Sequence, residues 1–175
     1  MMGAVSAGND PIVRTNLIGT ALFTGSAVIA AAVFTGPVRV VGVVVALALF
    51  AVGIFAFLWS YVTAVQRSRS DEIAVAQLYF LAGGSTPKPV KRLMLGALAA
   101  QTVVAFSTAI ARSRTDGRAG STLAFGILVP MFGIGLNGLW CSRHGSFAAR
   151  TPAVDPNSES VPTSDDEMEQ NSRHG

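Results

Sequence analysis

Four long apolar runs dominate the pattern of hydrophobic and polar positions along the chain. They cover residues 17–34, 40–65, 93–111 and 121–141, and none contains Asp, Glu, Lys, Arg or His. Because a helix rises about 1.5 Å per residue, about 20 residues cross a hydrocarbon core about 30 Å thick. None of the runs shows the polar face of a soluble surface helix or the period-two alternation of a strand. The pattern predicts an all-α fold, a four-helix transmembrane bundle.

The first run also has one feature of a cleaved secretory signal, because AAA at residues 30–32 resembles a small-residue cleavage site. Its apolar part is longer than the usual run of about 7–15 residues, and no polar segment precedes the site. We therefore expect the run to be retained as a membrane span.

A shorter apolar segment at residues 71–82 lies between the second and third runs. Ser70 can cap a helix there, two acidic residues follow it at the positive end of the helix dipole, and Gly83 and Gly84 can end it. These signals predict a short interfacial helix in the central cytoplasmic loop. It is interpreted either as a connector that shields the inner ends of the spans or as a docking or lipid-sensing element.

Basic residues flank this segment and follow the fourth run, where they would meet lipid headgroups. Each is expected to contribute about 1 kcal/mol near an anionic surface. The predicted headgroup ligands are Arg67, Arg69, Lys88, Lys91, Arg92 and Arg143.

Positive charges near the span ends also predict the orientation. With the N-terminus inside, eight basic residues are cytoplasmic and four are external, which places residues 1–16 and 142–175 in the cytoplasm of a cell-membrane protein. The cytoplasmic set is Arg14, Arg67, Arg69, Lys88, Lys91, Arg92, Arg143 and Arg150, and the external set is Arg39, Arg112, Arg114 and Arg118.

The charges are divided unequally between the body and the C-terminal tail. Only 13% of all residues are charged, against about 25% in globular chains. Residues 151–175 hold six acidic residues and one Arg and lack aromatics, so we expect a disordered acidic tail. Thr163 and Ser164 lie beside acidic residues that would suit an acid-directed kinase. The basic residues of the body cap apolar runs and do not interleave with aromatics, so no nucleic acid partner is expected.

The fourth run carries a stripe of small and polar residues. Gly126, Pro130, Gly133 and Asn137 are spaced four, three and four apart and therefore share one helix face. Small residues let another backbone approach closely, and an Asn can donate a hydrogen bond across helices. We predict that this stripe packs against a neighbouring span or partner; a hinge or a lipid-facing groove is the alternative.

Pro130 leaves the carbonyl of Gly126 without its helical donor and bends the helix. Ser107 and Thr108 are expected at a similar depth, so their hydroxyl groups are predicted to donate to this carbonyl. Gln101, in the middle of the third run, is the deepest bulky polar residue and is expected to pair inside the bundle.

Few residues suit catalysis or metal binding. A proton-coupled carrier usually needs an ionisable residue within a span, and the four runs have none. Cys141 and His144 are three residues apart, but no further ligand or orienting acid lies near them in sequence. We therefore predict no catalytic, cofactor-binding or metal-binding residue, and a protein that is not an enzyme.

At SRSDEIAVAQLYFLAG and LAFGILVPMFGIGLNGLWCSRHGSFAAR the chain resembles small four-span membrane proteins of actinobacteria that have no assigned activity. The resemblance covers about residues 15–150, and FAAR stands where that group is expected to have a proline-rich end. It implies residence in the cytoplasmic membrane and lends no function.

These features predict a non-enzymatic accessory or scaffold subunit of a membrane complex. Its expected partners are the lipid bilayer, anionic lipid headgroups, and either another membrane protein or further copies of the chain. The alternative is a small transporter or channel with a polar lining from Gln101, Ser107, Thr108 and Asn137.

Overall fold

The computed structural model describes residues 8–33, 35–112, 114–115, 118–119 and 122–150. The predicted acidic tail lies outside these residues. Within them, four helical segments are long and apolar enough to cross a membrane, which confirms a mostly helical, multi-pass architecture. They are α2 (Pro11–Val33), α3 (Gly36–Arg67), α5 (Lys88–Ala111), and a fourth segment formed by the 3-10 helix η1 (Thr122–Leu128) and α6 (Pro130–His144).

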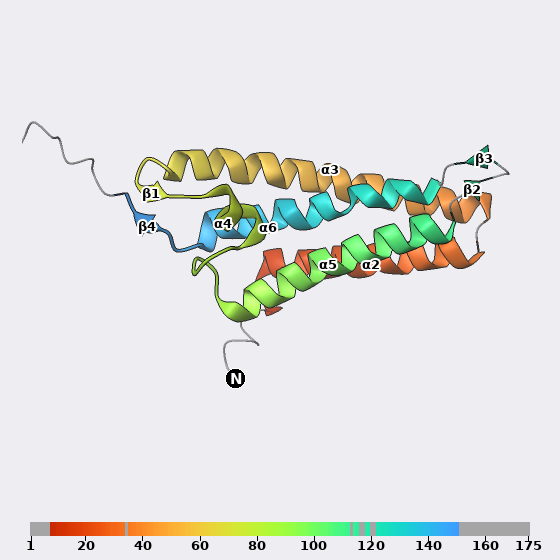
Figure 1. Ribbon diagram of the computed structural model, residues 1–175, viewed down its shortest axis with the longest axis horizontal. Coiled ribbons are helices and arrows are strands. Elements are labelled where there is room, and N and C mark those ends of the chain that lie inside the picture. The colour runs from red at the N-terminus through yellow and green to blue at the C-terminus, as the bar shows by residue number, and fades with distance from the viewer. Residues whose placement is uncertain (1–7, 34, 113, 116–117, 120–121, 151–175) are drawn as a thin grey trace, which may run out of the picture.

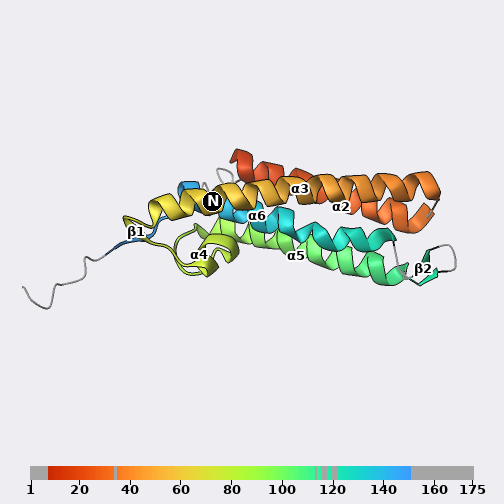
Figure 2. The same cartoon turned by 90° about the horizontal axis from the view of Figure 1, so that it is seen from above.

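The helices form an elongated bundle in which α6 is the central element. It packs most extensively against α3 and also contacts α2 and α5, while α2 lies along both α3 and α5 (Figures 1 and 2). In the apolar window of the fourth segment 56% of residues are buried, against 17% in that of α3. The last helix is therefore the core of the bundle, and α3 has the most open face.

The helices α2, α3 and α5 begin before the apolar runs that predicted them, because residues that precede those runs favour a first helical turn. Asp10 Oδ1 accepts hydrogen bonds from the backbone N–H groups of Ile12 and Val13 at 2.9 and 3.3 Å, so α2 begins at Pro11. Pro37 and Pro89 occupy the first turns of α3 and α5, where a missing N–H has no cost.

The helix predicted over residues 71–82 is wrong in extent. Its first residues form the strand β1 (Asp71–Glu72), which pairs antiparallel with β4 (Ala148–Ala149). Only α4 (Val75–Phe80) is helical. Ser70 Oγ donates to the Arg67 carbonyl at 3.1 Å and does not cap this helix. A second short ladder joins β2 (Arg114–Thr115) to β3 (Arg118–Ala119) at the other end of the bundle.

The short helix α4 is held by protein contacts along its C-terminal half. Leu78 and Tyr79 are 3% and 4% exposed and belong to the same core cluster as Trp140 of α6. Leu81 ends the helix in the left-handed region at φ 51°. Val75 and Phe80 remain exposed. This connector therefore packs against the C-terminal halves of α3 and α6, and only part of its apolar surface faces outward.

Candidate functional site

The predicted stripe of the fourth segment is closely packed against its neighbours in the bundle. A Cβ at Gly133 would lie 2.7 Å from Gln101 Oε1, and one at Gly126 would lie 3.2 Å from the ring of Phe23. Pro130 is half-buried between them, and Asn137 is fully buried. The structure thus places Gly126, Gly133 and Asn137 inside the bundle, where they face α2, α4 and α5, and leaves Pro130 half-buried.

A second row of glycines on α6 faces α3 and was missed by the sequence reasoning. A Cβ at Gly135 would overlap the Gly53 carbonyl oxygen, and one at Gly138 would lie 2.6 Å from Ser60 Oγ. A Cβ at Gly53 would lie 2.6 Å from the Phe132 backbone. The sequence gives little signal of this row, because the partner glycine lies within the uniform apolar run of α3.

The carbonyl that Pro130 leaves without an α-helical donor finds its donor within the same segment. The Gly126 carbonyl accepts a hydrogen bond from the Val129 N–H at 3.0 Å, because η1 winds more tightly than an α-helix. The predicted donation from Ser107 or Thr108 is therefore wrong. Thr108 Oγ1 donates to the Val104 carbonyl at 2.8 Å, and Ser107 is exposed on the outside of the bundle.

A buried polar cluster joins α5 to α2 in the interior. Gln101 Nε2 donates to Asn16 Oδ1 at 3.1 Å and to Thr20 Oγ1 at 2.7 Å, and Gln101 and Asn16 are 0% exposed. Within the described chain, Asn16 Nδ2 and Gln101 Oε1 are buried without a hydrogen-bond partner. The sequence reasoning missed Asn16, because the first apolar run begins one residue after it.

Asn137 and Tyr79 form a separate polar connection near the Asp10 end of the bundle. Asn137 Nδ2 donates to the Tyr79 carbonyl at 3.1 Å. The Tyr79 ring stacks on Phe57 with centroids 4.4 Å apart, and its hydroxyl donates to the Phe57 carbonyl at 3.4 Å. Burial raises the pKa of the Tyr79 phenol, and the hydrogen bond with Ser60 partly offsets the shift.

The four residues predicted to form a polar lining are not brought together. Gln101 pairs with α2, Asn137 pairs with α4, Thr108 bonds its own helix, and Ser107 faces outward. Gln101, Ser107 and Thr108 lie on α5 and Asn137 lies on α6, and the hydrogen bonds of Gln101, Thr108 and Asn137 lead to three different partners.

The predicted headgroup ligands differ in exposure. Arg67 is used inside the protein: its guanidinium pairs with Asp71 at 3.0 Å, donates to the Ser142 carbonyl at 3.0 Å and lies 5.2 Å from the Phe147 ring centroid. Lys91 is half-buried. The predicted headgroup ligands that are exposed are Arg69, Lys88, Arg92 and Arg143.

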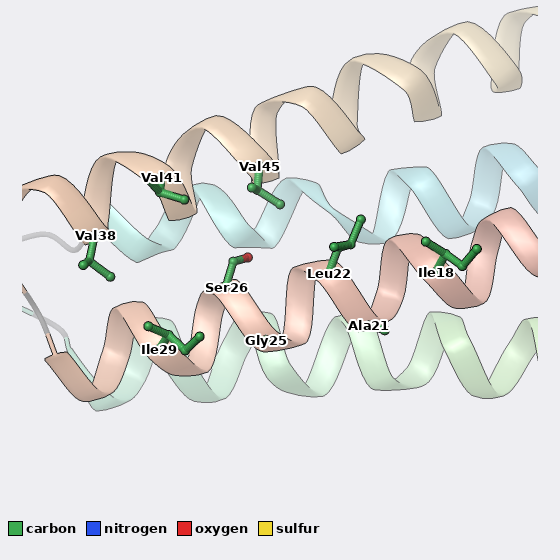
Figure 3. A pocket seen from close by; sticks show the side chains of 9 residues that line it. All are labelled: Ile18, Ala21, Leu22, Gly25, Ser26, Ile29, Val38, Val41 and Val45. Carbon is green, nitrogen blue, oxygen red and sulfur yellow. The ribbon is translucent and has the colours of Figure 1, made fainter.

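An apolar groove of about 610 Å³ lies between α2 and α3 (Figure 3). Its only side-chain hydroxyl, that of Ser26, donates to the Phe23 carbonyl of its own helix at 3.0 Å. Figure 3 shows the valines of α3 and the larger side chains of α2 facing the space between the two helices. The lining residues are Ile18, Ala21, Leu22, Gly25, Ser26, Ile29, Val38, Val41 and Val45.

Cys141 and His144 do not form a site together. Cys141 is fully buried, and its Sγ donates to the Gln77 carbonyl at 3.3 Å. His144 is exposed, and its ring centroid lies 5.4 Å from that of Trp140. Within the part of the chain that the structure describes, no group of three or more His, Cys, Asp or Glu residues could hold a metal ion.

Comparisons with family models, curated proteins and solved structures find no match to the chain. The resemblance to actinobacterial four-span proteins therefore stays a prediction.

Proposed function

We propose that this membrane protein acts by contact, as a non-enzymatic accessory or scaffold subunit that presents the open face of α3 to a membrane helix of another protein. The observation that carries the proposal is an exposed apolar stripe on α3 that extends from Val40 to Val65. The two ends of the stripe are 25 residues apart, which corresponds to about 38 Å along a helix and is longer than the hydrocarbon core of about 30 Å. A partner helix packed on the stripe would shield the part that is longer than the hydrocarbon core. Without a partner, the bundle would have to tilt to keep that part within lipid.

The stripe repeats with the spacing at which one helix packs along another. Its members are separated by three or four residues, so they lie on one face along the full helix. Phe55 is its most exposed member, at 66%, and its ring contacts Trp59 with centroids 5.9 Å apart. The stripe consists of Val40, Val44, Leu47, Ala51, Phe55, Leu58, Val62 and Val65.

Site-specific photo-crosslinking in native membranes tests this proposal. A photoreactive residue at Val44 or Phe55 should give one defined product, and Phe55→Ala should reduce the product formed from position 44. Val103 on α5 is the matched control, because it is also exposed and lies as far from the end of its helix as Val44 does from the start of α3. Equal products from Val103 would contradict the proposal, and a product containing only this chain would make the partner a second copy.

A cell-membrane location with both termini in the cytoplasm completes the proposal. Its support is the excess of Lys and Arg in the segments that would then be cytoplasmic. Single cysteines at positions 77 and 39, in a Cys141→Ser background, test the orientation in sealed cells with a membrane-impermeant thiol reagent. Labelling is expected at position 39, and labelling only at position 77 would reverse the orientation.

The second candidate function is transport, and one observation favours it. The buried amides of Asn16 and Gln101 each have an atom without a partner in the described part of the chain, as expected of groups that exchange partners with a passing polar solute. This candidate predicts ion or solute flux in liposomes that contain only the purified protein, and loss of the flux in Gln101→Leu. Liposomes that show no flux above protein-free controls would eliminate it.

A further inference from the structure

Positive charge is concentrated at the end of the bundle that holds Asp10. In the described ranges, eight basic and three acidic residues lie at this end, which leaves a net charge of +5. Figure 1 shows that α2 and α5 begin and that α3 and α6 end on this side. The basic residues are Arg14, Arg67, Arg69, Lys88, Lys91, Arg92, Arg143 and Arg150, and the acidic residues are Asp10, Asp71 and Glu72.

Two of these three acids already have partners within the fold. Asp10 accepts hydrogen bonds from the α2 backbone and from Trp140, and Asp71 pairs with Arg67. Most of the basic side chains are exposed, Arg69, Lys88 and Arg92 among them. The Asp71–Arg67 pair removes one charge of each sign, so the net charge of +5 is carried mainly by exposed basic side chains, and this surface is complementary to a polyanion.

The chain continues from this same surface into its most acidic stretch. Residues 151–175 hold six acidic residues and one Arg, a net charge of −5, and four of the acids fall within residues 165–169. Residue 165 is 15 residues beyond Arg150, so a chain that rises at most about 3.3–3.6 Å per residue can reach about 50 Å. A bundle two helices wide is about 20 Å across, so the acidic residues can reach every basic residue at this end.

We infer that residues 155–169 bind the basic surface of Arg69, Lys88, Lys91, Arg92 and Arg143, in competition with anionic lipid headgroups. Charge complementarity favours the contact, and the covalent connection at Arg150 keeps the acidic residues at a high effective concentration. The tail thereby limits how many anionic lipids this end of the protein holds. The inference does not rest on the proposed function, because α3 presents its open stripe along a different surface.

The lysine content makes a direct test possible. Lys88 and Lys91 are the only lysines in the chain, and both lie at the start of α5 on the basic surface. A carbodiimide joins a carboxylate to an amine without a spacer, so a link from a tail acid to either lysine reports direct contact. The full-length protein would be reconstituted at one copy per nanodisc in phosphatidylcholine, and linked peptides would be identified by mass spectrometry.

Two variants and two changes of condition define the expected results. Lys88→Arg with Lys91→Arg keeps the charge and should abolish the links, and the further change Arg39→Lys moves the only lysine to the other end, where no tail link should form. Raising the salt from about 0.01 M to about 1 M shortens the screening length from about 30 to about 3 Å and should lower the yield about ten-fold. Phosphatidylglycerol nanodiscs should lower the yield as well.

Each result either supports or overturns the inference. Tail links to Lys88 or Lys91 that fall with salt and with phosphatidylglycerol support it. Equal tail links to position 39 in the variant that carries Arg39→Lys, or an absence of links at low salt in phosphatidylcholine, would overturn it. A yield that is unchanged by phosphatidylglycerol would overturn the competition with lipid.

Discussion

The indole Nε1 of Trp140 donates a hydrogen bond to Asp10 Oδ2 at 3.0 Å, across 130 residues of sequence. The other carboxylate oxygen of Asp10 caps the first turn of α2. One aspartate thus fixes the start of the first membrane helix and ties it to the last one. The bundle is closed at this end by a polar contact at the edge of an otherwise apolar core.

Asp10→Ala should lower thermal stability in detergent more than Trp140→Phe does. Loss of the helix cap costs about 1 kcal/mol, and loss of a charge-assisted hydrogen bond costs about 1.5–3 kcal/mol. Trp140→Phe removes only the second contribution together with some packing. Thermal unfolding followed by circular dichroism measures both, with Glu72→Gln as an exposed control. A melting temperature for Asp10→Ala equal to that of the control would contradict the two roles of Asp10.

Gly135→Ala should destabilise the bundle by about 1–3 kcal/mol, because its Cβ would overlap the Gly53 carbonyl and push α6 away from α3. Gly25→Ala is the matched control: it makes the same change within an apolar helix, but its Cβ would meet no atom within 4 Å. That control should leave stability unchanged or raise it by up to about 1 kcal/mol through helix propensity. Chemical unfolding in mixed micelles compares the two, and equal effects would rule out close packing as the cause.

Gln101→Leu should cost about 1–2 kcal/mol, because it leaves the Asn16 and Thr20 side chains buried without their donor. The double variant Asn16→Leu with Gln101→Leu should recover part of this loss, because both amides then leave the interior. Unfolding of the single and double variants in the same detergent provides the thermodynamic cycle. A double variant as unstable as the sum of the two single variants would show that the amides do not interact.

Stability should fall at alkaline pH through ionisation of Tyr79. Burial raises the pKa of its phenol in the folded protein, so the neutral form is favoured there and the contribution is fully present below about pH 10, the ordinary value. It is lost as the pH rises through the raised pKa. Tyr79→Phe should cost about 0.5–1.5 kcal/mol at neutral pH but flatten this alkaline decline. Unfolding at several pH values between about 8 and 11.5 measures the slopes, and parallel slopes for the two proteins would contradict the assignment to Tyr79.

The bundle could be predicted from the sequence because burial in lipid forbids charges over a fixed length. The interior of the bundle could not. Asn16 is polar and precedes the first apolar run, yet its contact with Gln101 across 85 residues buries it. The path of α4 likewise depends on Tyr79 meeting Phe57 and Asn137, contacts that no local pattern of residues 71–82 encodes.

The remaining wrong prediction in the candidate site concerns the donor to the Gly126 carbonyl, which a local backbone N–H supplies. A proline in a membrane helix indicates that one carbonyl needs a new donor but does not indicate which donor supplies it. The sequence reasoning assigned this role to hydroxyls on another span, whereas the Val129 N–H, three residues from Gly126, supplies it. Gly126, Gly133 and Asn137 of the predicted stripe all lie in the interior, but their neighbours depended on the arrangement of all four helices.

The central position of α6 has a consequence for biosynthesis. The helix that contacts every other membrane segment is the last to leave the ribosome, so the first three must enter the bilayer before their common neighbour exists. Until then Gly53 has no glycine opposite it, and Arg67 lacks the Ser142 carbonyl to which it donates. Assembly of this protein is therefore completed after translation of the membrane domain rather than span by span.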